Sequence, residues 1–298
     1  MKAGPPLRAL ARACGTLAGV WLLLQGIPRW LPEDPARIAA GEWATEREVA
    51  AMRSLLRLDL PWPRALAANL RDLAHGSLGE SLRYHRPVAA LLREGFPVSL
   101  RLALLALVLS ALLAWTLALW RSGMSRTLVA AAVASPVYVL GPLLLWVVAL
   151  RIPGLPVAGI QGWSAWILPC TALAVPLAGH QARILASRIE FLREAAGPRW
   201  WRGSGVPDHL AWRRWLLPAA AGPWLTVLGL QLGALLGGAV LVETIFAIPG
   251  LGSLLVGALN TRDLPLMQAC VLLGAALFVG TQLLVAWVQG LLDPRMRT

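Results

Sequence analysis

The feature that most constrains the fold is a series of long segments without any Asp, Glu, Lys or Arg. Six such runs occur, at Ala13–Pro28, Leu102–Trp120, Thr127–Leu150, Ile152–Ala182, Trp215–Val242 and Leu264–Leu292. About 20 apolar residues in an α-helix cross a bilayer, because each adds about 1.5 Å. Charged residues make up only 14% of the chain, against about 25% in soluble domains. The sequence therefore predicts an all-α, polytopic membrane protein with six transmembrane helices.

The positive charge is distributed as membrane topology requires. The formal net charge is +12, and seven arginines lie between positions 183 and 214. With the N-terminus inside, this segment is an inner loop, whereas the short outer loops hold only Arg151 and Arg262. The positive-inside rule then places both termini in the cytoplasm. The basic excess indicates orientation in the membrane and not a nucleic-acid partner.

Three regions follow from this arrangement. Residues 1–30 form a cytoplasmic N-terminus and the first transmembrane helix, residues 31–95 a periplasmic helical segment, and residues 96–298 a five-helix core with a cytoplasmic loop at 187–215. Arg8 and Arg12 before the first run are also compatible with a cleaved signal peptide. We expect an uncleaved anchor, because no small-x-small cleavage site follows the apolar stretch.

The hydrophilic segment is expected to be a small helical cap on the outer face. Thr45 to Glu48 fits a capping box, and the apolar residues after it recur at helical spacing. Pro61 and Pro63 are expected to end that helix, and a second amphipathic piece covers 66–73. The cap has two open interpretations, a docking surface for a soluble partner or a cover over the helix bundle.

The fifth uncharged run leads into a predicted break. Pro218 suits a first helical turn, and glycines from Gly229 onward allow a neighbouring backbone to come close. After Val242 the sequence reaches Pro249-Gly250, which a lipid-facing helix cannot include. Irregular backbone at that depth must be buried in protein or line a wet cavity. The alternative is an ordinary helix end at the membrane surface.

One segment carries a resemblance to a known family. The sequence LGLQLGALLGGAVLVETIFAIPGLG (residues 228–252) is followed by Arg262-Asp263 and by Leu292-Asp293-Pro294-Arg295. In order and spacing it resembles the first permease subunit of the dipeptide, oligopeptide and nickel ABC importers. Weaker matches, such as Asp34-Pro35, extend the resemblance over nearly the whole chain. The resemblance implies the type I ABC importer permease fold in the bacterial inner membrane.

The same resemblance implies partners and a solute route. The partners are a second permease subunit, two ABC ATPase subunits and a periplasmic solute-binding protein, with membrane lipid around the helices. The residues expected at the translocation path or its outer gate are Gln231, Gly238, Glu243, Phe246, Pro249, Gly250, Gly252 and Asp263. For Glu243, a structural hydrogen-bonding role at the helix break is an equal alternative.

The inner loop is expected to dock the ATPase. The family signature there is Glu-Ala-Ala, a glycine a few residues later, and Leu-Pro at the start of the next helix. The corresponding residues are Glu194, Ala195, Ala196, Gly197, Gly205, Val206, Leu217 and Pro218. The spacing departs from the signature, and Pro198 and Pro207 would interrupt a continuous helix. The alternative is a basic loop held by anionic lipid headgroups.

Absent motifs argue against an enzyme. Lys2 is the only lysine, so the chain has no Walker A loop, and no hydrolase or zinc-protease motif occurs. His75 and His85 have no third metal ligand at a sensible spacing. We therefore expect no cofactor and no metal site, with ATP hydrolysed by a separate chain. The expected cargo is peptide-like. The alternatives are nickel or metal chelates, a permease-like protein that no longer couples to an ATPase, and a membrane-embedded enzyme.

Overall fold

The computed structural model describes residues 5–30, 32–41, 43–120, 122–149, 151, 156, 158–194, 205 and 207–292. Within these residues the regular structure is helical, apart from an isolated β-bridge between Glu80 and Pro87. The chain divides into two compact units, Met1–Ser99 with Pro249–Val279, and Leu100–Ile248 with Gly280–Thr298. The all-α fold class predicted from the sequence is thus confirmed, and each unit is described by itself.

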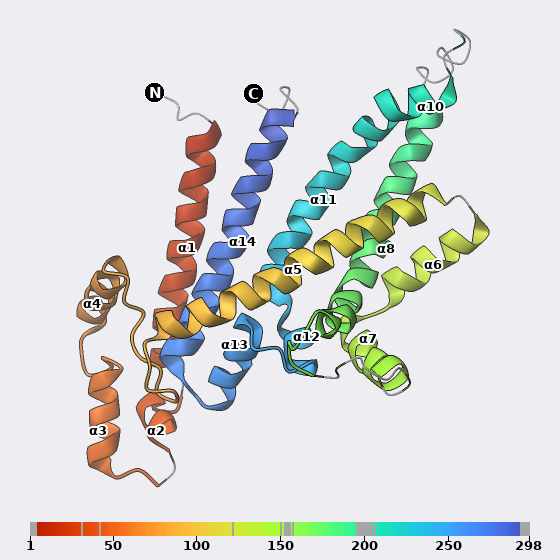
Figure 1. The fold of residues 1–298 in the computed structure, drawn as a ribbon. Helices are drawn as coiled ribbons and strands as arrows, with labels where there is room; N and C mark the ends of the chain where they lie inside the picture. Colours follow the sequence, from red (N-terminus) through yellow and green to blue (C-terminus); the bar gives the residue numbers. More distant parts are fainter. Residues whose placement is uncertain are drawn as a thin grey trace. The chain divides into compact units, whose positions relative to one another are not determined.

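The first unit contains a long apolar helix, a group of short helices beside its C-terminal end, and parts of two further long helices (Figure 1). Its elements are α1 (Pro5–Trp30), α2 (Pro35–Ala40), α3 (Glu46–Leu55), α4 (Trp62–Ala74), the start of α5 (Val88–Leu119), α13 (Leu251–Asn260) and the start of α14 (Leu264–Leu292). Arg29, at the end of α1, donates from Nη2 to the carbonyls of Arg57 and Leu60, which connect α3 and α4. The short helices are therefore hydrogen-bonded to the long one.

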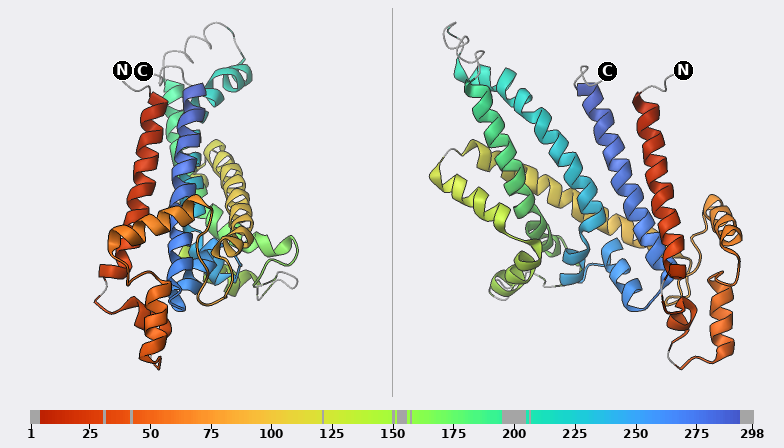
Figure 2. Two further views of the ribbon diagram at one scale, coloured as in Figure 1. Left: turned by 90° about the vertical axis from the view of Figure 1, so that its left-hand side faces the viewer. Right: turned by 180° about the vertical axis from the view of Figure 1, so that it is seen from behind.

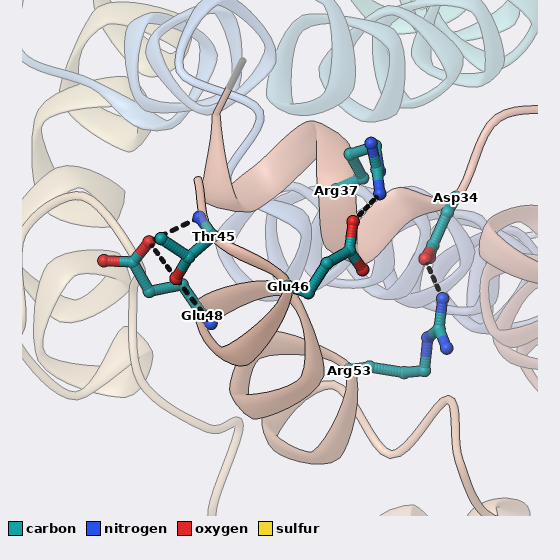
Figure 3. Close-up of polar contacts among 6 residues, drawn as sticks. All are labelled: Asp34, Arg37, Thr45, Glu46, Glu48 and Arg53. Atoms are coloured by element: carbon teal, nitrogen blue, oxygen red, sulfur yellow. Dashed lines mark hydrogen bonds and ion pairs between the residues drawn. The ribbon is translucent and has the colours of Figure 1, made fainter. Parts of the chain in front are cut away.

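The predicted capping box at the start of α3 is confirmed. Thr45 accepts a hydrogen bond from the Glu48 N–H, and the Glu48 carboxylate accepts from the Thr45 N–H at 2.7 Å (Figure 3). The expected end of this helix was wrong. α3 ends at Leu55, and Arg57 adopts a left-handed conformation with φ 57°. Pro61 is instead the N-cap residue of α4, and Pro63 lies in its first turn, where a missing N–H costs nothing.

The core of the first unit is where α5, α13 and α14 meet. The buried residues there are Val88, Leu91, Leu92, Leu251, Ala258, Leu266, Ala269 and Cys270. Gly95 of α5 allows the closest approach, since a Cβ at this position would lie 3.3 Å from the backbone carbon of Gly250. A side chain at position 95 would also lie 2.7 Å from Cδ1 of Leu254, so the glycine lets α5 and the start of α13 pack closely without a shift of either.

The second unit is built around α8. Its elements are the rest of α5, α6 (Gly123–Ala134), α7 (Val137–Leu144), the π-helical turn η1 (Leu145–Ala149), the 3₁₀ turn η2 (Ser164–Trp166), α8 (Ile167–Glu194), α10 (Asp208–Ala211), the π-helical turn η3 (Trp212–Leu216), α11 (Leu217–Gly238), α12 (Val240–Ile245) and the rest of α14. Small residues again set the closest contacts. A Cβ on Gly179 would lie 2.8 Å from the Val133 nitrogen, and one on Gly229 would lie 2.0 Å from Cγ2 of Val285. The neighbour at Gly229 is therefore a side chain, that of Val285, and not the backbone that the sequence led us to expect.

Long apolar helices correspond to most of the predicted spans. Among the described residues, four helices are long and apolar enough to cross a membrane, at Ala9–Trp30, Val88–Leu119, Trp212–Leu236 and Leu264–Gly290. A fifth span is possible as a broken pair, since α6 and α7 meet at an angle of 102° (Figure 2). The bend lies at Ser135-Pro136, where proline disfavours helix in the residue before it. Six spans therefore remain a prediction.

The short helices of the first unit should loosen in acid. Asp34 caps α2 by accepting from the Ala36 N–H, and it pairs with Arg53 of α3 (Figure 3). The side-chain hydrogen bond from Arg53 is the main reason that the pKa of Asp34 lies below its usual 3.8. Because the carboxyl pKa is lower in the folded protein than in the unfolded one, the ionised carboxylate stabilises the fold at pH values above the ordinary pKa. This stability is lost as the pH falls through the lowered pKa of the folded protein. We expect faster proteolysis of segment 35–55 in that acidic range, measured with an acid-active protease.

The matched control is Asp34→Asn, which keeps a side-chain oxygen for the cap but removes the charge. This variant should be cleaved faster than wild type already at neutral pH, measured with a protease active there, and its cleavage by the acid-active protease should change less on acidification. Equal pH dependence in both proteins would show that Asp34 is not the responsible group.

Candidate functional site

The residues expected to dock an ATPase flank the inner loop of the second unit. Glu194 is exposed at the last position of α8, and Leu217 and Pro218 open α11. The helical segment that contains them begins earlier than predicted, because η3 precedes α11 without a gap. Gly205 has φ +75°, and an added Cβ there would meet nothing within 4 Å. Ala195, Ala196, Gly197 and Val206 lie outside the described residues.

A contact missed by the sequence analysis closes the base of this loop. The guanidinium carbon of Arg193 lies 4.3 Å from the ring centroid of Trp212, so the last turn of α8 is joined to η3 by a cation–π contact. Trp212 also packs against a buried cluster formed by Ala114, Ala118, Ala182, Leu185, Ile189 and Ala220. The contact fixes the two ends of the inner loop relative to each other and to the core of the second unit.

Gln231, one of the expected path residues, belongs to a buried polar network. Its side-chain oxygen accepts from Nε2 of Gln181, which is fully buried in α8, at 2.6 Å. The same nitrogen of Gln181 donates to Oγ of Ser110 in α5 at 2.9 Å, and its oxygen accepts from Nε1 of Trp224 at 2.9 Å. A buried amide needs such partners, since an unsatisfied polar group costs about 1–3 kcal/mol. The network joins α5, α8 and α11.

The helix break in the second unit comes later than predicted. The chain was expected to leave the helix after Val242, but α12 continues through Glu243 to Ile245. Ala247 then takes a left-handed conformation with φ 49°, and the Ile248 N–H donates to the Glu243 carbonyl at 2.7 Å. A hydrogen bond from the Phe246 N–H to the Val242 carbonyl closes the last turn, so Glu243 lies within α12 and Phe246 is its C-cap. Gly238 ends α11 just before this segment.

Both Glu243 and Phe246 are buried, at 1% and 2% exposure. The Phe246 carbonyl accepts from the Gly159 N–H at 2.9 Å, so the loop before α8 contacts the end of α12. Gly141 of α7 lies against Ile245, where an added Cβ would be 3.1 Å from Cδ1. The break is thus only partly enclosed, since Phe246 and Ile248 are buried whereas Ala247 is exposed; irregular backbone enclosed by protein or lining a wet cavity stays a prediction.

In the first unit, the chain after the break begins α13. Pro249 precedes Gly250, the N-cap of α13, and Gly252 lies buried in the first turn. The Leu251 N–H donates to Oγ of Ser99 in α5 at 2.7 Å. A side chain from another helix therefore satisfies a backbone donor that the helix start leaves free.

Asp263 forms a buried junction in the first unit. Its Oδ2 accepts from the Ser81 hydroxyl at 2.5 Å and from the Arg83 N–H at 3.2 Å. Its Oδ1 accepts from the Leu266 N–H at 3.2 Å and so caps α14. Asp263 is 0% exposed and Ser81 is 2% exposed. The carboxyl group joins the start of α14 to a turn 180 residues earlier in the sequence.

The comparison with protein families is decisive. Residues 106–298 match the family described as binding-protein-dependent transport system inner membrane component. The chain belongs to this family. It is a permease subunit of an ABC importer, as the resemblance in residues 228–252 predicted.

Similarity to individual permeases extends over nearly the full length. The chain is 34% identical to a probable peptide ABC transporter permease, y4tP of Sinorhizobium fredii, with 98% of both chains covered. It is 33% identical to the glutathione transport system permease GsiC of Pectobacterium atrosepticum, with 95% of both covered. GsiC of Salmonella typhimurium is 31% identical, with 98% of both covered.

Solved structures share the fold of the permease. An amino acid ABC transporter superposes with a TM-score of 0.52 at 20% identity, over 69% of this chain and 94% of that one. The inward-facing methionine transporter MetNI gives 0.55 at 16% identity, over 68% of this chain and 96% of that one. At these identities the likeness supports the ABC permease fold alone.

The environment of Asp263 predicts a mainly structural effect of its removal. Asp263→Ala takes away a helix cap, worth about 1 kcal/mol, and leaves the Ser81 hydroxyl and the Arg83 N–H without their acceptor. We expect the free energy of unfolding of the permease to fall by about 2–4 kcal/mol. Thermal unfolding of the purified permease would show this as a lower Tm.

Asp59→Ala is the control, because Asp59 is exposed in the same unit. If Asp263→Ala instead keeps the wild-type Tm while solute uptake is lost, Asp263 acts on the solute and not on the fold.

Proposed function

We propose that this permease imports small peptides or peptide-like solutes from the periplasm. The carrying observation is its near full-length similarity to permeases named for peptide and glutathione transport. As alternative cargo, a bare nickel ion would favour clustered metal ligands on the protein, whereas a metal chelate already carries its own ligands. Among the described residues, no group of three His, Cys, Asp or Glu side chains lies close enough to hold a metal ion.

We propose that ATP is hydrolysed by two separate ATPase chains docked under the inner loop. The absence of a P-loop lysine from the sequence supports this division of labour. A second permease and a periplasmic solute-binding protein would complete the importer, in keeping with the family description. The arginine-rich loop at 183–214 supports an orientation with both termini in the cytoplasm.

The Arg193–Trp212 contact suggests how docking would be transmitted. An ATPase can shift the permease between two states only through contacts that differ between those states. A force on the inner loop would act on α8 and η3 together, because the cation–π contact joins them. The buried Gln181 network would carry that movement on to α5 and α11.

We propose that residues 194–218 form the coupling segment and that Gln231, Gly238, Glu243, Phe246, Pro249, Gly250, Gly252 and Asp263 lie at or near the solute path.

The cargo proposal is tested by competitive uptake into proteoliposomes that contain the assembled importer. We expect unlabelled di- and tripeptides to reduce uptake of a labelled small peptide at least tenfold more effectively than nickel chelates do. The control is the same importer without ATP, which should show no concentrative uptake. Preferential uptake of chelates would replace the peptide assignment by the metal-chelate alternative.

The coupling proposal is tested at Gly205. An added side chain there meets nothing within the described permease, so a bulky residue should disturb only a docked partner or the backbone. Gly205→Arg should reduce vanadate-sensitive uptake and the copurification of the ATPase by at least about tenfold.

Gly205→Asn separates disturbance of a docked partner from strain in the backbone, because asparagine tolerates the left-handed conformation better than arginine does. We expect it to retain much of the uptake. Gly76→Arg, at an exposed position with the same φ of +75° and nothing described within 4 Å of an added Cβ, should retain it too, because it lies outside the inner loop. Wild-type uptake by Gly205→Arg would remove the coupling assignment at this position.

A further inference from the structure

A cavity of about 200 Å³ lies within the first unit, at the C-terminal end of α1. Its walls come from α1, from the segment between α3 and α4, from α4 itself, and from the start of α14. All of these residues belong to the same compact unit. The cavity is therefore an internal feature of that unit, and none of the predicted coupling or path residues lines it.

The cavity has an apolar side and a polar side. Trp21, Leu24, Leu66, Ala269 and Leu272 contribute carbon surface. The polar lining residues are Gln25, Arg29, Arg57, Asn69, Asp72, Ser77 and Gln268. Such a lining suits a ligand with a polar head and an apolar remainder, because both parts would find matching surface.

The polar lining carries an excess of positive charge. Arg57 pairs with Asp72, at 2.6 Å between Nη2 and Oδ2, which compensates one guanidinium. Arg29 is bonded only to the backbone carbonyls of Arg57 and Leu60, and it forms no ion pair among the described residues. Glu33 and Asp34 line a shallower depression that shares Arg29, but Asp34 is already paired with Arg53. Among the residues that line the cavity, Arg29, Arg57 and Asp72 together carry a net charge of +1.

Both guanidinium groups retain hydrogen-bonding capacity. A guanidinium has five N–H donors, and Arg29 and Arg57 each make two hydrogen bonds. Three donors therefore remain on each side chain. Planar guanidinium groups bind phosphate oxygens through charge-assisted hydrogen bonds, often two at a time.

The backbone at this site is held in an uncommon conformation. Arg57 has φ 57°, which costs energy for a residue with a side chain. Its carbonyl accepts from Arg29, and its side chain donates to Asn69 and Asp72. Asn69 in turn donates to Gln25 of α1 at 2.8 Å. These bonds fix the guanidinium of Arg57 in the cavity wall before any ligand arrives.

The depth of the cavity in the membrane indicates where its ligand comes from. Arg29 lies in the last turn of α1 and is the first charged residue after the uncharged run Ala13–Pro28. Charged groups at such a position lie at the level of the lipid headgroups. The start of α14, a second apolar helix of sufficient length to span, forms another part of the wall, where Gln268 donates to the Leu24 carbonyl of α1 at 2.8 Å.

We infer that this cavity binds the headgroup phosphate of one phospholipid, taken from the leaflet at the C-terminal end of α1. The phosphodiester carries a single negative charge and would contact Arg29 and Arg57, and the acyl chains would leave along the apolar side. Under the proposed orientation this is the outer leaflet. The bound lipid would fasten the short helices α2–α4 to α1 and α14.

Two substitutions test the site by independent means. Arg29→Gln removes the uncompensated charge, and Ala65→Leu fills the cavity without changing any charge, since the buried Ala65 is part of its wall. The matched controls are Arg47→Gln and Ala67→Leu, both exposed positions outside the cavity. Ala67→Leu adds the same volume to the same helix, α4.

The measurement is the amount of phospholipid that remains on the assembled importer after exhaustive detergent washing, determined by mass spectrometry. We expect one additional phospholipid per permease in wild type and in both controls. Both cavity variants should retain at least about tenfold less of this phospholipid. Arg29→Gln loses charge-assisted hydrogen bonds, and Ala65→Leu fills the cavity. If all variants retain the same amount as wild type, no such site exists.

A second measurement separates a lipid from a free anion. Dioctanoyl phosphatidylglycerol should raise the Tm of the delipidated importer, whereas inorganic phosphate or glycerol 3-phosphate at the same concentration should not. An equal shift by inorganic phosphate would identify a free-anion site and overturn the lipid assignment. If Arg29→Gln fails to fold, Ala65→Leu against Ala67→Leu still decides the question.

Discussion

The fold of the permease depends on one requirement. In the hydrocarbon core of a bilayer, every backbone N–H and C=O must find a hydrogen-bond partner within the protein. Long helices meet the requirement by themselves, and the places where helices stop need help from elsewhere. The start of α13 receives it from the hydroxyl of Ser99, and the start of α14 from the carboxyl group of Asp263. The end of α12 receives it from the Gly159 N–H. Two of these three points are thus closed by a residue distant in sequence, whereas Asp263 lies next to the helix that it caps.

The same requirement explains the few polar side chains inside the helices. Gln181 is fully buried, and its amide is bonded to Ser110, Gln231 and Trp224 on two other helices. On α14, Gln289 donates to Thr226 of α11 at 2.7 Å. Without water as an alternative partner, these side chains bond to one another, and the helices that carry them become linked. The links provide a physical route along which movement of an inner loop would reach the helices around it.

Local signals in the sequence located the helices well but their ends less well. The capping box at Thr45 was predicted correctly, because it is formed by residues three apart. The end of α3 was not, since Arg57 leaves the helix in a left-handed conformation that its bonds to Asn69 and Asp72 maintain. The break after Val242 was expected about three residues too early, because Pro249 and Gly250 show that a helix must stop and not where.

The sequence by itself determined the class of the protein: uncharged runs of membrane-spanning length, arginines gathered in one loop, and a family motif at residues 228–252. The uncharged runs are local signals, and a bilayer favours their folding into helices. Only the tertiary structure decided which side chains meet. The junction of Asp263 with Ser81, the contact of Arg193 with Trp212, and the cavity beside Arg29 each join segments that no spacing rule relates. Their partners are set by packing between helices, which depends on the whole chain.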